Sequence, residues 1–315
     1  MTTNQSDTFE IGESTVHRLG FGAMRICGDD IIGAPEDEAA ARELLREVVD
    51  LGVDFIDTAD AYGPGTNERL IREALHPDEG ATGDSRPGAD KGATGDGRPG
   101  ADQSATGDGR PGAYGDAFVA TKGGILRNPD GGWLPHGDPD YLRNACLASL
   151  DRLGVDSIDL YQLHRPDPDT EFEASVTTLA ELKDDGLVEN VGLSNVSVAQ
   201  LETARDHVDI ATVQNEYNLA NPEHADVLAA CEDADIGFIP YFPIGAGDLG
   251  EKAAVIDEVA ERHDASGYQV ALAWLLGHSN VTLPIPGTSS IEHLRENVAA
   301  SELELSGDEI ARLSE

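Results

Sequence analysis

Four side chains that could carry out acid–base chemistry lie at or near the ends of strand-like segments. Asp57 ends Gly-Val-Asp-Phe-Ile-Asp and Tyr62 follows five residues later, Lys122 ends Phe-Val-Ala-Thr-Lys, and His164 ends Asp-Leu-Tyr-Gln-Leu-His. If these strands are parallel neighbours, their carboxyl ends converge and the four groups share one pocket. A phenol with a pKa of about 10 is a poor proton donor at neutral pH, whereas a phenol beside Lys122, itself held by Asp57, is expected to lose its proton more readily. The sequence therefore predicts that Tyr62 is a general acid.

The elements that position these residues alternate between strand and helix, which is typical of a parallel sheet. Eight strands are predicted, near 16–20 and at 54–57, 117–121, 158–163, 188–193, 211–215, 237–241 and 281–284. Amphipathic helices are predicted at 37–51, 68–75, 140–153, 173–185, 198–206, 223–235, 255–262 with 269–276, and 291–299, followed by a short helix at 307–314. Eight such units predict an α/β protein with a (β/α)8 TIM barrel as a single domain over residues 1–315, whose active site lies on the loops after the strands.

One segment, 79–115, does not fit a barrel. A twelve-residue repeat rich in Gly, Pro and Asp begins at Ala81, Ala93 and Ala105. It can bury no core, so we expect a disordered, flexible insertion between the second helix and the third strand. This position lies at the amino-terminal face, opposite the chemistry. A spacer without function is the preferred interpretation, and a partner-binding segment is the alternative.

The charge of the chain limits its partners. The 315 residues carry a formal charge of −39, from 21 basic and 60 acidic residues, and the acidic residues are spread over every predicted helix. Such a surface repels nucleic acid and anionic membranes, so the expected partners are small molecules. Concentrated salt would screen the self-repulsion, and we therefore expect a halophilic protein from a salt-rich cytoplasm, with an ordinary acidic mesophilic enzyme as the alternative.

Cysteine usage and the amino terminus favour a cytoplasmic location. Cys27, Cys146 and Cys231 are odd in number and widely spaced, which favours reduced thiols over bridges or metal ligands. Residues 1–10 have no basic region and no apolar core, and no apolar stretch approaches the roughly 18 residues that span a bilayer. No metal site, secretion signal or membrane anchor is predicted.

Longer motifs around the four residues resemble the signatures of the aldo-keto reductase superfamily. They are the segment 149–164, Ser-Leu-Asp-Arg-Leu-Gly-Val-Asp-Ser-Ile-Asp-Leu-Tyr-Gln-Leu-His, and the pattern Gly52…Asp57-Thr-Ala…Tyr62-Gly, and the resemblance continues through Gly192-Leu-Ser-Asn and Leu283-Pro-Ile-Pro-Gly-Thr. The resemblance implies a (β/α)8 barrel that binds an extended nicotinamide cofactor and reduces aldehydes or ketones to alcohols by hydride transfer. It also implies that Asp57, Tyr62, Lys122 and His164 are the catalytic tetrad, in which Tyr62 donates the proton, Lys122 lowers its pKa, Asp57 fixes Lys122 and His164 orients the carbonyl.

The same resemblance implies a set of cofactor-binding positions. Side chains that both donate and accept hydrogen bonds would hold the nicotinamide carboxamide, an aromatic residue would stack on its ring, and glycine-rich loops and a helix amino terminus would bind the phosphates. These positions are Gly22, Ala23 and Met24 beside the nicotinamide, Asp57, Ser194, Asn195 and Gln214 at its carboxamide end, Tyr241 for stacking with Phe242, Pro243 and Ile244 after it, Gly245 and Gly247 for pyrophosphate, Gly287, Thr288, Ser289 and His293 for the adenosine 2′-phosphate, and Glu296 and Asn297 for adenine.

The cofactor implied is NADP, with NAD as the alternative. Many members of the superfamily carry a lysine near Gly287 and an arginine near His293, and both cations are absent from this sequence. The glycines at 245, 247 and 250 also match the dinucleotide pattern of a Rossmann fold. We reject that interpretation because a second helix, not a strand ending in an acid, follows the helix at 255–262.

Three functions remain to be compared. The first is the reductase, in which Trp133, Leu126 and Met24 form an apolar wall over a small-molecule carbonyl substrate; Trp133 could equally fill a loop. The second is a cofactor-binding, redox-sensing subunit with little turnover. The third makes Lys122 the Schiff-base lysine of a barrel aldolase, although Asp57 should keep it charged. Neither the physiological carbonyl nor the oligomeric state follows from the sequence.

Overall fold

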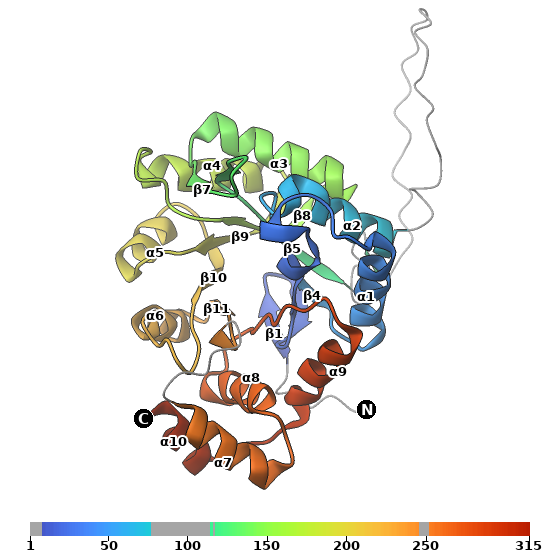
Figure 1. The fold of residues 1–315 in the computed structure, drawn as a ribbon. Coiled ribbons are helices and arrows are strands. Elements are labelled where there is room, and N and C mark those ends of the chain that lie inside the picture. Colours follow the sequence, from blue (N-terminus) through green and yellow to red (C-terminus); the bar gives the residue numbers. More distant parts are fainter. Residues whose placement is uncertain (1–7, 77–113, 116, 246–251) are drawn as a thin grey trace, which may run out of the picture.

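A ring of parallel strands surrounded by helices forms the body of the protein (Figure 1). The structure is a computed structural model, and it describes residues 8–76, 114–115, 117–245 and 252–315. Seven strands form one parallel sheet in the order β11-β10-β9-β8-β5-β4-β3. Their bounds are β3 Phe21–Gly22, β4 Phe55–Asp57, β5 Phe118–Gly123, β8 Ile158–Leu163, β9 Val188–Ser194, β10 Ile210–Glu216 and β11 Gly237–Tyr241.

Helices follow the strands along the chain and pack on the outside of the sheet (Figure 1). They are α1 Glu38–Asp50, α2 Thr66–Leu75, α3 Pro139–Leu153, α4 Phe172–Asp184, α5 Val198–Arg205, α6 Ala225–Ala234, α7 Ala253–His263, α8 Gly267–His278, α9 Ile291–Ala299 and α10 Gly307–Ser314. Short 3-10 turns lie at η2 Ala23–Ile26, η3 Asp29–Ile31, η4 Gly63–Gly65 and η7 Ala300–Glu302. The buried apolar residues of the helices and the outward-facing residues of the strands form the larger of the two apolar core clusters.

The segment 281–286 joins the two edge strands of this sheet. Phe238 of β11 exchanges backbone hydrogen bonds with Val281 and Leu283, and on the other side Gly20 and Gly22 donate to Pro284 and Pro286. The predicted eighth strand is therefore present as a bridging segment with few ladder bonds, because prolines at 284 and 286 cannot donate to a ladder. Seven strands and this segment together have the arrangement of the predicted (β/α)8 barrel.

The interior of the ring changes from apolar to polar along each strand. Alternate residues point inward, so Phe118, Ala120 and Lys122 of β5 share one face. The inward residues nearest the strand starts form a second apolar cluster, which includes Phe55 and Leu160 and is completed by residues of β1 and β2. Polar inward residues near the strand ends therefore lie in one layer at the opposite, carboxyl-terminal end.

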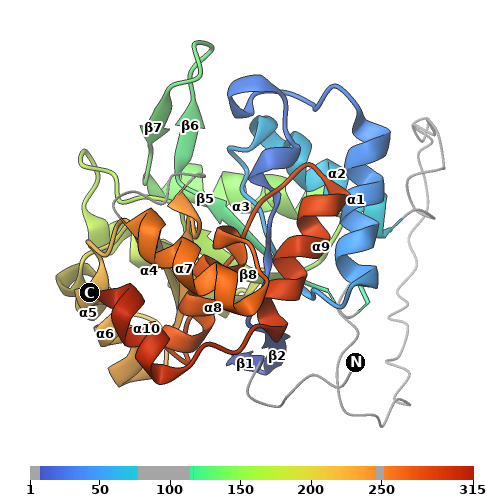
Figure 2. The same cartoon turned by 60° about the horizontal axis from the view of Figure 1, so that its bottom comes forward.

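Two hairpins lie outside the parallel sheet, and the sequence did not predict either (Figure 2). β1 Thr8–Ile11 pairs with β2 Ser14–His17 at the amino-terminal end of the ring, and β6 Ile125–Arg127 pairs with β7 Trp133–Pro135 at the other end. The predicted first strand near 16–20 is therefore misplaced: residues 14–17 belong to the closing hairpin, and the barrel strand is β3.

The predicted insertion at 79–115 lies outside the described residues, except for Tyr114 and Gly115. Tyr114 is buried and donates a hydrogen bond from its hydroxyl to the Leu153 carbonyl, so the chain rejoins the barrel just before β5. Within the described part of the chain, no helix combines the length and the apolar character needed to cross a bilayer.

Gly20 packs closely against Phe55 and the bridging segment, which leaves no space for a larger side chain. A methyl group at this position would lie 2.6 Å from Phe55 Cδ1, 2.9 Å from the Phe55 carbonyl oxygen and 3.1 Å from Ile285 Cγ2. Gly20→Ala should therefore lower the free energy of unfolding by about 1–3 kcal/mol through overpacking. Gly307→Ala is the control, because nothing lies within 4 Å and its helical position favours alanine. Denaturant unfolding of both variants measures the effect, and equal stability of the two would contradict this packing at the bridging segment.

Candidate active site

A buried ion pair between neighbouring strands forms the centre of the polar layer. The ammonium group of Lys122 donates to Asp57 Oδ2 at 2.7 Å and to the Thr58 carbonyl at 2.7 Å. Lys122 has no exposed surface, and burial lowers the pKa of its ammonium group, while the charge of Asp57 opposes this shift. Lys122 is the second-last residue of β5 and Asp57 is the last residue of β4. The pairing of these two strands therefore brings them together.

Two carboxamides hold the other oxygen of Asp57. Gln214 Nε2 donates to Asp57 Oδ1 at 2.8 Å, and Gln162 Nε2 lies 3.4 Å from the same oxygen. Gln214 was predicted to hold a nicotinamide carboxamide, and one of its two N–H groups is used here to bind Asp57. Gln162 was not predicted, although it stands two residues before His164 and therefore on the same face of β8.

Tyr62 lies beside this ion pair, but its acidity differs from the prediction. Lys122 Nζ is 5.2 Å from the centre of the Tyr62 ring. Burial and the negative charge of Asp57 raise the pKa of Tyr62 well above its ordinary value. The net lowering of the Tyr62 pKa that the sequence predicted is therefore not found, because the buried phenolate would lose its water and would lie near the negative charge of Asp57. Tyr62 is a protonated phenol at neutral pH.

His164 packs against Tyr62 as an uncharged ring. The ring centres are 5.8 Å apart at an angle of 82°. Burial and the positive charges of Lys122, Arg165 and Arg127 lower the pKa of His164 well below its ordinary value. Its Nδ1 is buried without a hydrogen-bond partner.

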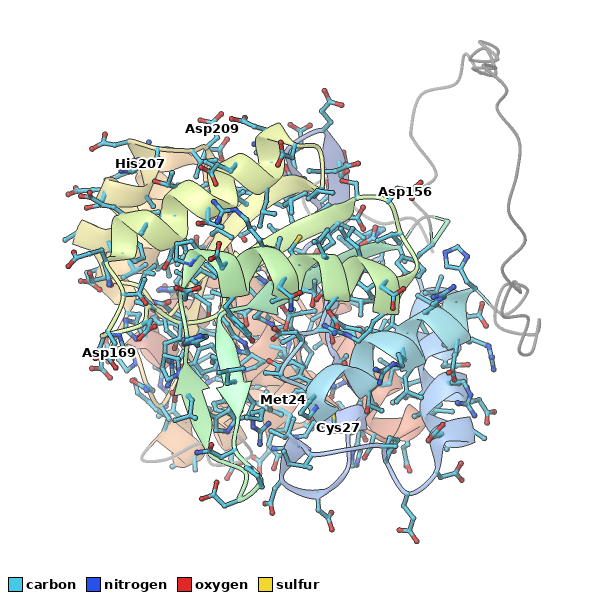
Figure 3. The ribbon with its side chains drawn as sticks, turned by 90° about the horizontal axis from the view of Figure 1, so that it is seen from above. Met24, Cys27, Asp156, Asp169, His207 and Asp209 are labelled. Carbon is cyan, nitrogen blue, oxygen red and sulfur yellow. The ribbon has the colours of Figure 1, made fainter. Side chains whose placement is uncertain are left out.

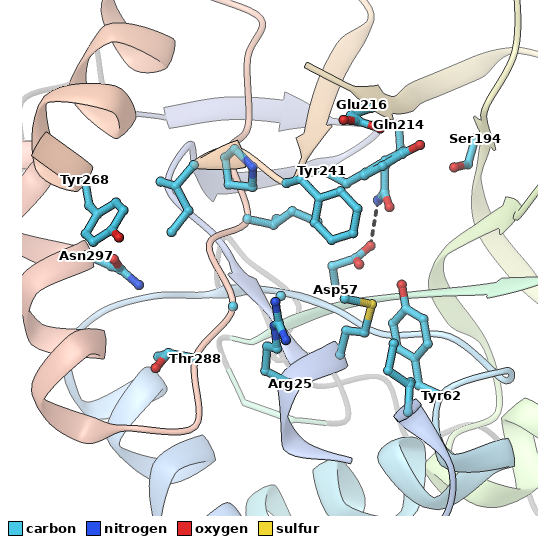
Figure 4. Close-up of a pocket in the computed structure, with 18 of the residues that line it drawn as sticks. Arg25, Asp57, Tyr62, Ser194, Gln214, Glu216, Tyr241, Tyr268, Thr288 and Asn297 are labelled. Atoms are coloured by element: carbon cyan, nitrogen blue, oxygen red, sulfur yellow. Dashed lines mark hydrogen bonds between the residues drawn. The ribbon is translucent and has the colours of Figure 1, made fainter. Parts of the chain in front are cut away.

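Tyr62 and His164 line one end of an elongated cavity of about 660 Å³ (Figure 4). Asp57 lies at the same end, and Tyr268, Thr288 and Asn297 lie at the other (Figure 4). The amino termini of α8 and α9 border that second end. Both are capped by serines, since Ser266 accepts from the Gln269 N–H and Ser290 from the His293 N–H.

Most predicted cofactor positions line this cavity. The residues placed there are Gly22, Met24, Asp57, Ser194, Asn195, Gln214, Tyr241, Phe242, Pro243, Ile244, Gly287, Thr288, His293, Glu296 and Asn297, and Trp133 joins them. Asn195 is held in a left-handed conformation at φ 59° and accepts a hydrogen bond from the Tyr241 hydroxyl at 2.9 Å.

Among the described residues, four predicted catalytic or cofactor-binding positions are not part of the cavity lining. Ala23 and Gly245 do not line it, and Ser289 is exposed to solvent beyond it. Lys122 lies behind Asp57 and also does not reach the cavity, which argues against a Schiff-base role. Gly247 lies outside the described residues.

Several lining residues were missed by the sequence analysis. Arg25 and Arg165 are cations directly after the predicted Met24 and His164, and this adjacency was an available signal in a chain with so few cations. Glu216 follows Gln214 at an interval of two on β10. Tyr268 and Gln269 come from the start of α8, and only the closed ring brings them to the cavity.

Asp60 lies between Asp57 and Tyr62 in the chain and points away from the cavity lining. Its N–H donates to the Lys122 carbonyl at 3.1 Å, its Oδ2 lies 3.5 Å from the Tyr141 hydroxyl, and its Oδ1 is buried without a partner. Burial, with the nearby charge of Glu68, raises the pKa of Asp60 to about 8. Among the residues described, no group of three or more His, Cys, Asp or Glu side chains is arranged to hold a metal ion.

The chain is similar to proteins of one known family. The sequence model of the Aldo/keto reductase family matches residues 18–315. An uncharacterized oxidoreductase of Schizosaccharomyces pombe is 38% identical over 99% of this chain and 90% of its own length. The pyridoxine 4-dehydrogenase of Escherichia coli is also 38% identical, over 98% of this chain and 97% of its own length.

A solved structure has the same fold. The aldo/keto reductase from Klebsiella pneumoniae, crystallised in complex with NADP and acetate, superposes with a TM-score of 0.72 at 25% identity. The superposition covers 98% of this chain and 94% of that one.

The raised pKa of Asp60 predicts a dependence of stability on pH. Between the unfolded pKa of about 3.9 and the folded pKa of about 8, the unfolded chain releases this proton while the folded chain keeps it, so Asp60 makes the protein less stable as pH rises. The free energy of unfolding of Asp60→Asn minus that of the wild type should therefore increase from pH 5 to pH 8, by at most about 1.4 kcal/mol per pH unit, and then level off. Denaturant unfolding across this range, with exposed Asp156→Asn as control, measures the difference. A flat difference would show that Asp60 is ionised in the folded protein.

Proposed function

The chain belongs to the aldo/keto reductase family, and from that membership we propose that it reduces an aldehyde or ketone to an alcohol with NADPH, using Tyr62 as the general acid. The observation that carries the proposal is the protonated phenol of Tyr62 beside the buried Lys122–Asp57 pair at one end of the elongated cavity. The enzyme is an oxidoreductase of this family. The family relationship supports a nicotinamide cofactor, since a structural relative binds NADP.

The residues of the cavity fit an extended dinucleotide. Ser194, Asn195 and the Oε1 of Gln214 offer the mixed donors and acceptors that a carboxamide needs. At the far end, Thr288 and the amino terminus of α9 suit a phosphate. Gly22 and Gly287 let the two cavity-lining segments approach each other closely, because a methyl group on either would come within 2.7 Å of a carbonyl oxygen of the other segment. When bound, NADPH would supply the hydride.

Arg25 supports a preference for NADP over NAD. A methyl group built on Gly287 would lie 3.4 Å from Arg25 Cγ, so this exposed cation stands beside the phosphate end of the cavity. We assign it the electrostatic part of the role that a lysine near Gly287 has in many relatives. An arginine binds phosphate with a forked pair of N–H groups.

Tyr62 would transfer its proton to the carbonyl oxygen as negative charge develops there. The resting phenol is a weak acid, so the transfer depends on stabilising the phenolate that it leaves. The Lys122 charge, 5.2 Å from the ring centre, provides that stabilisation, and Asp57 keeps Lys122 in place. Gln162 and Gln214 in turn fix Asp57.

His164 would orient the same oxygen as a neutral hydrogen-bond donor. Its lowered pKa keeps the imidazole uncharged, so only one ring nitrogen carries a proton. We place that proton on Nε2. A proton on Nδ1 would give a buried N–H group without a hydrogen-bond acceptor, which is unfavourable. Tyr62 and His164 then present two donors to one oxygen.

The substrate class that the cavity favours is a flat, largely apolar carbonyl compound. Met24, Ile31, Ile125 and Trp133 line the cavity near Tyr62, and Arg165 adds a cation at its edge. One relative is named a pyridoxine 4-dehydrogenase. Pyridoxal and benzaldehyde are therefore the first aldehydes to test.

We also propose that the protein is adapted to high salt. Asp156, Asp169 and Asp209 are exposed, and their side chains project outward at separate places around the edge of the molecule in Figure 3. At 1 M salt the Debye length is about 3 Å, so repulsion between such exposed charges is largely removed.

The role of Tyr62 is tested by Tyr62→Phe. Losing the proton donor should lower kcat by about a hundredfold or more while NADPH binding stays unchanged. Tyr114→Phe is the matched control, because its hydroxyl bonds the Leu153 carbonyl away from the cavity. The assay is NADPH oxidation at 340 nm with pyridoxal and benzaldehyde in molar KCl, with NADH and NADPH affinities measured by fluorescence titration. Near-normal turnover of the variant would rule Tyr62 out, and tight NADPH binding by a wild type that reduces no aldehyde would favour the sensing subunit.

The salt proposal predicts that the unfolding temperature is roughly 10 °C or more higher in 3 M than in 0.1 M KCl, corresponding to about 7 kcal/mol for a chain of this size. A variant in which Asp156, Asp169 and Asp209 are all changed to Asn should be stabilised at 0.1 M KCl more than at 3 M, since fewer charges then need screening. Calorimetry measures both. An unfolding temperature that is independent of salt would contradict the proposal.

A further inference from the structure

One guanidinium group joins three loops beside Tyr62. Arg127, the last residue of β6, donates to the carbonyls of Asp30 at 2.8 Å, Ile31 at 3.1 Å and Ala61 at 3.3 Å, and to Gly131 at 2.9 Å in its own hairpin. Asp30 and Ile31 lie in the chain between η2 and α1, and Ala61 directly precedes Tyr62. Figure 2 shows the β6–β7 hairpin and the chain before α1 on the same side of the barrel.

Two of the acceptors have strained backbone conformations. Asp30 and Ile31 are consecutive residues with φ values of 53° and 60°. A β-branched residue such as isoleucine rarely adopts a positive φ, and each such conformation costs about 1 kcal/mol or more unless its surroundings impose it. Arg127 binds both carbonyls and so stabilises this conformation together with the backbone hydrogen bonds of the turn, and Ile31 lines the cavity.

Arg127 also covers the indole of Trp133. Its guanidinium carbon lies 3.8 Å from the centre of the Trp133 ring. The indole in turn meets Tyr62 with ring centres 6.2 Å apart and His164 at 6.1 Å, both edge to face. Trp133 is 36% exposed and lies on a short hairpin, so the contacts with Arg127 and these two rings help to set the orientation of its indole.

We propose that Arg127 is a positioning residue that ties these three loops into one wall and sets the Trp133 indole over the place where a carbonyl substrate meets Tyr62 and His164. The inference rests on the proposed function and extends it to substrate choice. A flat aromatic aldehyde that reaches the indole should depend on this wall, whereas a small aliphatic aldehyde should not. A displacement of about 1 Å in such a wall is enough for a large loss of rate.

The test compares Arg127→Met, which removes charge and hydrogen bonds, with Arg127→Lys, which keeps the charge but loses the fork. Both should lower kcat/KM for benzaldehyde about tenfold or more, chiefly through KM, while kcat/KM for propanal changes less than about threefold and the Kd of NADPH is unchanged. Arg143→Met on the outer face of α3 is the control and should match the wild type. Equal losses with both aldehydes would overturn the proposal.

A double-mutant cycle tests whether Arg127 acts through Trp133. Trp133→Ala should itself lower kcat/KM for benzaldehyde, and adding Arg127→Met to it should cost less than a further threefold, because contacts that act as one unit are not additive. Multiplicative losses would mean that Arg127 acts independently of the indole, contrary to the proposal.

Fluorescence gives a readout that does not require turnover. The protein has two tryptophans, and Trp274 is 2% exposed, so acrylamide quenching reports mainly on Trp133. Arg127→Met should increase the quenching constant, and unchanged quenching would overturn the proposal that Arg127 holds the Trp133 indole in place. If the wild type reduces no aldehyde, the proposed function fails, but the quenching result still decides whether Arg127 holds Trp133.

Discussion

The buried ion pair between Lys122 and Asp57 is the constraint on which the rest of the site depends. Burying two opposite charges is favourable only when every remaining donor and acceptor is also satisfied. Here Lys122 bonds Asp57 and the Thr58 carbonyl, and two carboxamides complete Asp57. Strands β4, β5, β8 and β10 therefore each contribute a side chain to one polar layer.

The polar layer and the second apolar cluster below it both follow from the alternation of inward-facing and outward-facing residues along each strand. On β5 the inward face carries Phe118 and Ala120 before Lys122, and the hairpin of β1 and β2 completes the apolar end. Water is thus excluded from one side of the ion pair, while the cavity opens on the other. The chemistry is placed at the carboxyl-terminal end because only there does the inward face become polar.

The state of Tyr62 shows why a neighbouring cation need not make a phenol acidic. Lys122 is paired, and the closest negative charge, Asp57, disfavours a second anion. The proton therefore stays on Tyr62 at neutral pH. In the reaction that we propose, the charge of Lys122 acts when the phenolate forms, and the wall that we propose Arg127 holds selects the carbonyl compound that reaches Tyr62.

The strand and helix pattern, apart from the first strand, could be predicted from the sequence because periodicity is a local property. The positions of Asp57, Lys122 and His164 at or near the ends of strands could be predicted for the same reason, since each depends on one segment of the chain. The sequence could not determine that Lys122 is hidden from the cavity, that Gln214 holds Asp57, or that α8 contributes Tyr268. It also missed the two hairpins, whose strands are only three or four residues long. Contacts such as these form between segments far apart in the chain, and burial, which shifted the pKa of Tyr62 upward, exists only once the ring has closed.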